Sequence, residues 1–209
     1  MSNYENLPPQ EIENTSFQII RSELSHRLDP EQEPIILRCI HTSADFDYQD
    51  SLYFSEGVIE KALTAFQGGA NLITDTQMAL AGINKRAAKE LGLSLHCFVA
   101  DPELATKAKE LGVTRSKLAV EKGLSLPEPQ ILVIGNAPTA LLHLADLIAK
   151  GQADPALVIG VPVGFVNVLE AKAAIMEQPV PQIVNRGRKG GSNIAAAIVN
   201  ALMYQLVER

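Results

Sequence analysis

The stretch QILVIGNAPTA, residues 130–140, combines a strand, a loop and the start of a helix. Its apolar run ends at Gly135-Asn136, and Pro138 opens the helical pattern that continues as ALLHLADLIAK. Glycine permits close backbone approaches that a side chain would prevent, and proline suits the first turn of a helix, where its missing N–H has no partner anyway. A buried strand that leads through a loop into a helix is typical of α/β proteins, which bind ligands at such loops.

The sequence alone leaves two interpretations of this loop open. Backbone N–H groups at the start of a helix hold anions, so the loop is a candidate anion site. Alternatively, the turn serves packing only, since most loops carry no chemistry. The chain contains neither GxGxxG nor GxxxxGK[ST], which argues against a nicotinamide-dependent dehydrogenase and against a P-loop nucleotide site.

Apolar runs of strand length alternate with segments of helical periodicity along the rest of the chain. Cap signals lie between them in the expected order, for example Asp101-Pro102 before one helix and Gly112 after it. This alternation predicts an α/β fold with a parallel sheet of about five strands and helices on both faces. The expected strands are the runs at residues 71–75, 95–100, 131–134, 156–161 and 182–185.

Three other segments carry expectations about the fold. The polar residues 1–14, approximately, are expected to be loosely ordered. Residues 34–41, PIILRCIH, fit a strand or a helix, and we favour a helix because Pro34 and two acidic residues before it suit a helix start. Residues 192–207 predict a last helix packed on the sheet, with Ser192 as its N-cap.

Length and composition restrict the class of protein. The 209 residues are enough for one substantial core and no polar linker divides them, so one domain over residues 1–209 is expected. The net charge of −6 argues against broad binding to nucleic acid or to an anionic membrane. No apolar run approaches the roughly 20 residues that span a bilayer, and the first residues do not resemble a secretory signal, so we expect a soluble, cytoplasmic protein. Cys39 and Cys97 lack metal-ligand spacing, and no metal site is expected.

His41 is the histidine best placed for chemistry. It ends an apolar segment, and on a helix it shares a face with Arg38, three residues earlier. The polar residues 42–45 follow, so the imidazole is expected at the edge of a cleft. The alternative is an ordinary hydrogen-bonded histidine, which is common in proteins. The other three histidines lie in a charged stretch, a predicted strand and a leucine-rich helix, and are poorer candidates.

A second candidate site is the stretch NRGRKGGSN, residues 185–193, between the last strand and the last helix. Its cations Arg186, Arg188 and Lys189 suit a carboxylate or a phosphate, and its glycines, among them Gly190, let the backbone approach a ligand. A solvated basic loop is the alternative. Because the chain as a whole is acidic, this loop is expected to mark where an anionic small molecule docks.

Several loops are expected to meet along the carboxyl edge of the parallel sheet, where ligands bind in such folds. They are the loops at residues 74–78 and 161–165, together with the loop that contains Gly135 (the Gly135 loop) and the stretch at residues 185–193 (the basic loop). Arg115, at a predicted helix start, adds another cation. The sequence has no GxSxG nucleophile elbow, HExxH pair or close carboxylate dyad, so hydrolase functions have little support.

Several segments, in the order in which they occur along the chain, resemble the precorrin-8X methylmutase family. Together they extend over nearly the whole chain. Several such segments in the family's order are highly specific, whereas a single one would not be. The matching segments are SFQII at 16–20, the pattern from Arg38 to His41, FSEGVIEKA at 54–62, TRS at 114–116, GNAPTAL at 135–141, PVGFV at 162–166 and RGRKGGS at 186–192. The resemblance implies an isomerase of cobalamin biosynthesis that moves a methyl group from C11 to C12 of a corrin precursor, either precorrin-8X or cobalt-precorrin-8.

The resemblance also implies a flavodoxin-like doubly wound domain and a homodimer with substrate sites near the subunit interface. It places the catalytic histidine on His41, and Ser16 and Arg38 match positions associated with the substrate. No cofactor is needed, because the shift is intramolecular and redox-neutral. The substrate is a tetrapyrrole with several carboxylate arms, so dispersed cations are sensible clamps. The other expected substrate-binding residues are Arg115, Gly135, Asn136, Thr139, Arg186, Arg188, Lys189, Gly190 and Ser192.

The chain departs from the family pattern at two places. Thr42-Ser43-Ala44 stands where the family often has Ala-Cys-Gly after its histidine, and Thr74-Asp75 stands where a Cys-Asp pair is frequent. These differences leave the assignment of His41 intact and affect the fine shape of the pocket.

The expected mechanism gives His41, as imidazolium, the task of donating a proton or a strong hydrogen bond to a ring nitrogen of the tetrapyrrole. Arg38 should lower the pKa of this imidazole, and a substrate carboxylate or a protein acid is expected to offset that effect. A substrate that already contains cobalt has no vacant ring nitrogen, so His41 would then act differently. The rival hypothesis is a non-catalytic module that binds a corrinoid or a nucleotide through the same loops without His41.

Overall fold

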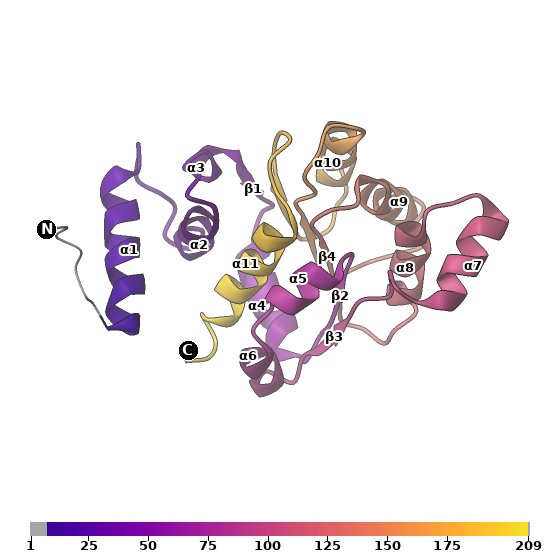
Figure 1. The fold of residues 1–209 in the computed structure, drawn as a ribbon, viewed down its shortest axis with the longest axis horizontal. Helices are drawn as coiled ribbons and strands as arrows, with labels where there is room; N and C mark the ends of the chain where they lie inside the picture. Colours follow the sequence, from indigo (N-terminus) through magenta and orange to yellow (C-terminus); the bar gives the residue numbers. More distant parts are fainter. Residues whose placement is uncertain (1–7, 209) are drawn as a thin grey trace, which may run out of the picture.

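A six-stranded sheet runs through the centre of the structure, a computed structural model that describes residues 8–208 (Figure 1). Five strands are parallel, and the sixth, β1, pairs antiparallel with β6 at one edge. The order across the sheet is β1-β6-β5-β4-β2-β3. The strands are β1 (Leu52–Phe54), β2 (Asn71–Thr74), β3 (Ser94–His96), β4 (Gln130–Ile134), β5 (Leu157–Gly160) and β6 (Gln182–Asn185).

The prediction of about five parallel strands is therefore corrected to a mixed sheet of six. All five predicted strands exist, although β3 is shorter than residues 95–100 and begins one residue earlier. The missed strand, β1, has only three residues, too few to show a sequence period, and it is defined by its pairing with β6, 131 residues away at Tyr53 and Val184. Distant pairing of this kind leaves no local signal.

Helices cover both faces of the sheet, as expected (Figure 1). Because both faces are covered, every residue of β4, β5 and β6 is buried, and the strands show no alternation of apolar and polar residues. One face carries α4 (Val58–Gln67), α5 (Gln77–Gly82), α6 (Lys85–Glu90) and α11 (Ser192–Met203). The other carries α8 (Arg115–Leu124), α9 (Pro138–Ala149) and α10 (Val168–Met176), with α7 (Pro102–Leu111) packed on α8.

A further layer lies outside α11. Helix α2 (Glu33–Ser43) packs against α11, and α1 (Pro9–Glu23) packs on α2 from the far side, so α1 is the element most remote from the sheet (Figure 1). The short helix α3 (Tyr48–Ser51) connects α2 to β1. The helical interpretation of residues 34–41 is confirmed, with its apolar side chains buried against the core.

The prediction of a loosely ordered N-terminal segment is wrong from Pro9 onward, where α1 begins, and its first seven residues lie outside the described part of the chain. Helix α1 is amphipathic, and its buried stripe includes Ile20. Between residues 8 and 208, no helix is long and apolar enough to cross a membrane.

The last helix also differs from its prediction. Gly191, not Ser192, occupies the N-cap position, and no side chain caps the helix. The Ser192 hydroxyl instead lies 2.7 Å from the hydroxyl oxygen of Thr76, on the loop after β2. The helix ends at Met203, four residues before the expected end, and a turn follows it at residues 204–206. By contrast, Asp101 caps α7 as predicted: its Oδ1 accepts the N–H of Glu103 at 2.9 Å.

The strand order creates a switch point between β2 and β4. The chain leaves β2 toward β3 on one side and later fills β4 on the other, so the loops that follow these two strands diverge from the same place. In open parallel sheets, ligands bind outside the carboxyl ends of the strands at such a point. The loop after β2 begins with Asp75, and the loop after β4 with Gly135.

Candidate functional site

The loop after β4 is arranged around a carboxylate of the protein itself. Asp75 accepts the N–H of Gly135 at 3.0 Å on Oδ1, and the N–H groups of Asn136 and Ala137 at 2.7 Å each on Oδ2. The side chain is 6% exposed, and burial raises its pKa while the three backbone hydrogen bonds lower it. The loop does hold an anion, as its sequence suggested, but that anion is Asp75.

This arrangement engages the backbone of Gly135 and Asn136, whose binding of substrate stays a prediction. Their N–H groups are already used by Asp75 and are not available to a ligand. The glycine itself is required by packing, because a Cβ at position 135 would lie 2.8 Å from the Cα of Ser192 and 2.9 Å from the carbonyl oxygen of Gly191. The loop therefore packs closely against the start of α11 at the switch point. The side chain of Asn136 remains exposed there.

The basic loop between β6 and α11 packs against the loop after β5. The N–H of Gly191 donates to the carbonyl of Val161 at 2.9 Å, and the N–H of Gly164 donates to the carbonyl of Arg188 at 3.2 Å. A side chain at Gly190 is impossible without rearrangement, because its Cβ would lie 2.2 Å from the carbonyl oxygen of Val161. The close backbone approach expected of Gly190 is therefore an approach to the backbone of Val161.

The cations of this loop have different surroundings. The Lys189 ammonium pairs with Asp45 at 2.6 Å and also with Asp47, and these carboxylates raise its pKa. Arg186 is exposed and its guanidinium lies 5.1 Å from the centre of the Tyr53 ring. Arg188 is exposed, and within residues 8–208 its side chain has no ion-pair partner. Arg186 and Arg188 are the cations of this loop that stay open to an anionic ligand.

Lys189 also joins the basic loop to the segment that contains the candidate histidine. Its partners Asp45 and Asp47 follow the end of α2, only a few residues after His41. The chain turns there through Ala44, which has a positive φ of 54° and whose N–H donates to the carbonyl of Ile40 at 2.7 Å. The ion pairs therefore hold the end of α2 beside the carboxyl edge of the sheet.

His41 lies on the last turn of α2 and is exposed, in agreement with its expected position at an edge. Its ring centre is 5.3 Å from that of Phe17 on α1. Partial burial is the larger cause that lowers its pKa, and the charge of Arg38 lowers it further. The predicted effect of Arg38 is confirmed in direction.

Arg38 connects α1 to α2. Its Nη1 lies 2.5 Å from Oε1 of Glu13, and its guanidinium lies over the Phe17 ring at 4.7 Å and near the Tyr204 ring at 5.6 Å. Its Nε is buried and has no hydrogen-bond partner within the described part of the chain. Glu13 is thus the protein acid beside this cation. Ser16, one turn away on α1, is half-buried and donates to the carbonyl of Ile12 at 2.7 Å.

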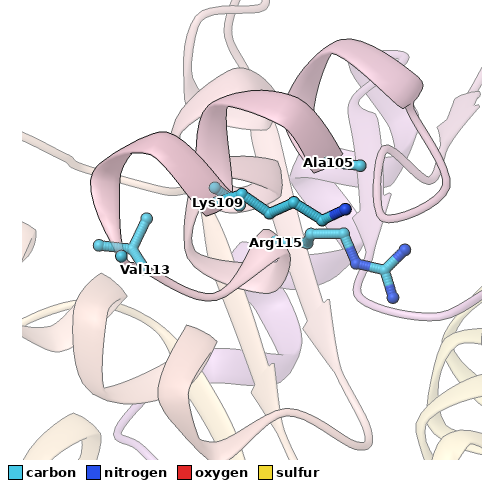
Figure 2. Close-up of a pocket in the computed structure, with 6 residues that line it drawn as sticks. Ala105, Lys109, Val113 and Arg115 are labelled. Carbon is cyan, nitrogen blue, oxygen red and sulfur yellow. The ribbon is translucent and has the colours of Figure 1, made fainter.

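Arg115 stands apart from the basic loop, at the start of α8. The hydroxyl of Thr114 caps this helix, accepting the N–H of Lys117 at 3.3 Å, and lies 3.3 Å from the hydroxyl of Thr139 at the start of α9. Arg115 also borders an open hollow of about 550 Å³ on α7, and Figure 2 shows Lys109 extended along the helix toward it. Two cations from neighbouring helices thus border one apolar hollow.

The structure therefore gathers the predicted residues into two groups. Ser16, Arg38 and His41 lie where α1 meets α2, whereas the Gly135 loop, the basic loop and Arg115 lie along the carboxyl edge of the sheet. The ion pairs of Lys189 connect the two groups. Ser192 is 8% exposed and engaged with Thr76, so its role is to fix α11 at this edge.

Sequence reasoning missed four residues that shape the site. Asp75 is the last residue of a predicted strand. Its position directly before the switch point was a signal that it shapes the site. Lys172 is 1% exposed on α10, and its occurrence among the apolar residues of LEAKAAI was a signal as well. Glu13 and Phe17 lie on α1, which was not expected as a helix, and no signal indicated their contact with α2.

The geometry defines a class of protein: an α/β protein with exposed cations along the carboxyl edge of its sheet and a histidine on an adjoining helix. Comparison with known proteins agrees. The family model for precorrin-8X methylmutase matches residues 11–205. This chain is 43% identical to a cobalt-precorrin-8 methylmutase of Salmonella typhimurium, over 96% of this chain and 97% of the relative. It is 41% identical to the cobalt-precorrin-8 methylmutase of Priestia megaterium, over 93% of this chain and 87% of the relative.

A solved structure shows the same similarity. The crystal structure of a precorrin-8X methylmutase from Thermus thermophilus superposes with a TM-score of 0.86 at 43% identity, over 93% of this chain and 94% of that one. The chain belongs to the precorrin-8X methylmutase family.

Proposed function

We propose that this chain is the isomerase that shifts a methyl group from C11 to C12 of precorrin-8X or cobalt-precorrin-8, giving hydrogenobyrinate or cobyrinate in cobalamin biosynthesis. The observation that carries the proposal is membership of the family over residues 11–205, joined to a histidine held beside a cationic loop. In the shift, the bond from the methyl group to C11 breaks and a bond to C12 forms. No atom leaves and no electron is lost, so the reaction needs no external reactant.

The exposed guanidinium groups are proposed to bind the carboxylate arms of the substrate. Arg186 and Arg188 lie on the basic loop, and Arg115 lies at the start of α8, so cations stand at separate points along one edge. Guanidinium groups bind carboxylates through two parallel hydrogen bonds, which fix orientation as well as position. A macrocycle held at several arms is restrained close to its reactive conformation, and this restraint supplies part of the acceleration. Asn136 and Thr139, both exposed, border the same edge.

His41 is the proposed catalytic residue, with Arg38 and Ser16 beside it. As imidazolium it donates a proton to a ring nitrogen of the metal-free substrate, which polarises the conjugated system, and it recovers the proton after the shift. In the free protein, burial and Arg38 keep its pKa below 6.5, so the neutral imidazole predominates at pH 7. Substrate carboxylates near the ring raise this pKa on binding, since a nearby negative charge favours the imidazolium.

The metal-free and cobalt-containing substrates place different demands on His41. Cobalt occupies the ring nitrogens, so with that substrate His41 is limited to a hydrogen bond with another group. The relatives from Salmonella typhimurium and Priestia megaterium are named for cobalt-precorrin-8, whereas the family model is named for precorrin-8X. Both substrates therefore belong in the assay.

A homodimer with its interface on α1 is also part of the proposal. Ile12 and Ile19 are 51% and 52% exposed, and their spacing of seven residues places them on one face of α1. The other side of α1 packs on α2 through Glu13 and Phe17, beside His41. A second copy that covers the outer face of α1 would bring its own side chains close to the catalytic histidine.

The test is conversion of precorrin-8X and of cobalt-precorrin-8 by the purified protein, followed by absorption spectroscopy and mass spectrometry. The expected product has an unchanged mass and the spectrum of the rearranged macrocycle. A protein that binds the pigment and leaves both substrates unrearranged would instead be the non-catalytic module that the loops alone also allow.

A further inference from the structure

Lys172 is a lysine buried inside α10 and directed at the basic loop. Its side chain is 1% exposed, and the helix residues around it, such as Ala171 and Ile175, are buried as well. The Nζ donates to the carbonyl oxygens of Gly187 and Lys189, at 2.8 Å each. Within residues 8–208, no carboxylate pairs with this ammonium. Burial lowers its pKa to about 8, so it still carries a charge at neutral pH.

Packing alone does not call for a charge at this position. A buried ammonium is costly unless hydrogen bonds replace its lost water, and an unbranched apolar side chain would fill a similar volume without that cost. What distinguishes the lysine from an apolar residue here is its pair of hydrogen bonds to the loop. The explanation for Lys172 therefore lies in the conformation of residues 186–191.

Three consecutive carbonyl groups of the loop are bound on the protein side. The Lys172 ammonium donates to the carbonyls of Gly187 and Lys189. The N–H of Gly164 donates to the carbonyl of Arg188 at 3.2 Å. Asn185 adds a second donor to the carbonyl of Lys189, at 2.7 Å, and its own side-chain oxygen accepts the hydroxyl of Ser51 at 2.6 Å.

The inward carbonyls determine where the N–H groups point. In a trans peptide the C=O of one residue and the N–H of the next point in opposite directions. With the carbonyls of residues 187–189 turned inward, the N–H groups of Arg188, Lys189 and Gly190 point away from the protein interior. In agreement, none of these three N–H groups has an acceptor within the part of the chain that the structure describes.

We propose that Lys172 is a positioning residue for the substrate carboxylates: by holding the carbonyls of Gly187 and Lys189 inward, it presents the loop N–H groups and the guanidinium of Arg188 to one carboxylate arm. Lys172 itself does not touch the substrate. The inference rests on the proposed function, because it assigns the loop to a carboxylate of the tetrapyrrole. It adds a residue outside the predicted set and a chemical reason for the shape of the loop.

The test compares Lys172→Met with Lys150→Met, which makes the same substitution at an exposed lysine directly after the end of α9. KM and kcat are measured separately for the methyl shift, and the melting temperature is recorded. Lys172→Met is expected to raise KM about tenfold or more while kcat changes by less than about threefold, because binding of one arm is lost before the chemistry. Its melting temperature should stay close to that of the control, since the lost hydrogen bonds are offset by removal of a buried charge.

An unchanged KM in folded Lys172→Met overturns the inference, and so does a lower melting temperature with KM unchanged, which would mark a purely structural lysine. If the methionine variant does not fold, Lys172→Gln against Lys150→Gln gives the same comparison with the same criterion on KM. Absence of turnover in the wild-type protein refutes the proposed function instead. The two failures are thus distinguishable.

Discussion

Replacing Asp75 with asparagine should destabilise the loop after β4. The carboxylate accepts three N–H groups with its two oxygens, and Oδ2 alone accepts those of Asn136 and Ala137. An asparagine offers one acceptor oxygen, and its NH₂ group would face an N–H donor. With the oxygen toward Asn136 and Ala137, the N–H of Gly135 loses its acceptor, and with the opposite orientation two N–H groups lose theirs.

The size of the effect follows from burial. A buried donor left without its partner costs roughly 1–3 kcal/mol, and repulsion between the NH₂ group and the facing N–H adds to this. The gain from burying a neutral amide in place of a carboxylate, whose pKa burial raises, offsets part of the loss. A net loss of about 3 kcal/mol corresponds to a decrease in melting temperature of roughly 6–12 °C for a chain of this length.

The assay is thermal unfolding of Asp75→Asn beside Asp146→Asn. Asp146 forms an exposed ion pair with Lys150 four residues later, and solvent screening makes the loss of such a pair of little consequence for stability. If Asp75→Asn melts within about 2 °C of this control, the three hydrogen bonds do not organise the loop and the assignment of Asp75 is wrong.

Further predictions concern pH, α1 and the acid beside Arg38. In the proposed mechanism the imidazolium of His41 is the active form, and its pKa lies below 6.5 in the free protein, so kcat/KM for the metal-free substrate should fall as pH rises through that pKa; a rise over the same range would assign the neutral imidazole. Glu13→Gln should move this fall to lower pH, because Arg38 then acts on His41 without its balancing carboxylate, and an unmoved profile would separate Glu13 from the site. Ile19→Asp should convert the proposed dimer to a monomer in sedimentation analysis, with Asn14→Asp, at an exposed position on another face of the same helix, as the control; a dimer that survives places the interface elsewhere.

The sequence predicts what local patterns determine. Strand β4 and helix α9 were expected because the apolar run, Gly135 and Pro138 each act within a few residues. Position 41 was expected at an edge because a polar run follows it. The Asp101 cap was likewise a local pattern.

Contacts between distant segments explain most of the corrections. The N–H groups after β4 bind Asp75, about sixty residues earlier, and Lys189 pairs with Asp45 and Asp47, more than 140 residues earlier. Ser192 leaves its predicted capping role for Thr76. Each residue type was suited to its expected role, but the partner that engages it is supplied by the tertiary fold.

In the proposed mechanism, His41 performs proton chemistry on the bound macrocycle. The most direct measurement is the single-turnover rate of His41→Ala with saturating metal-free precorrin-8X, together with titration of the rearranged product into the same variant. If His41 performs this chemistry, the rate should be lower by about 10²- to 10⁴-fold, with product affinity within a few-fold of the wild-type value. A variant that rearranges the substrate at the wild-type rate would contradict it.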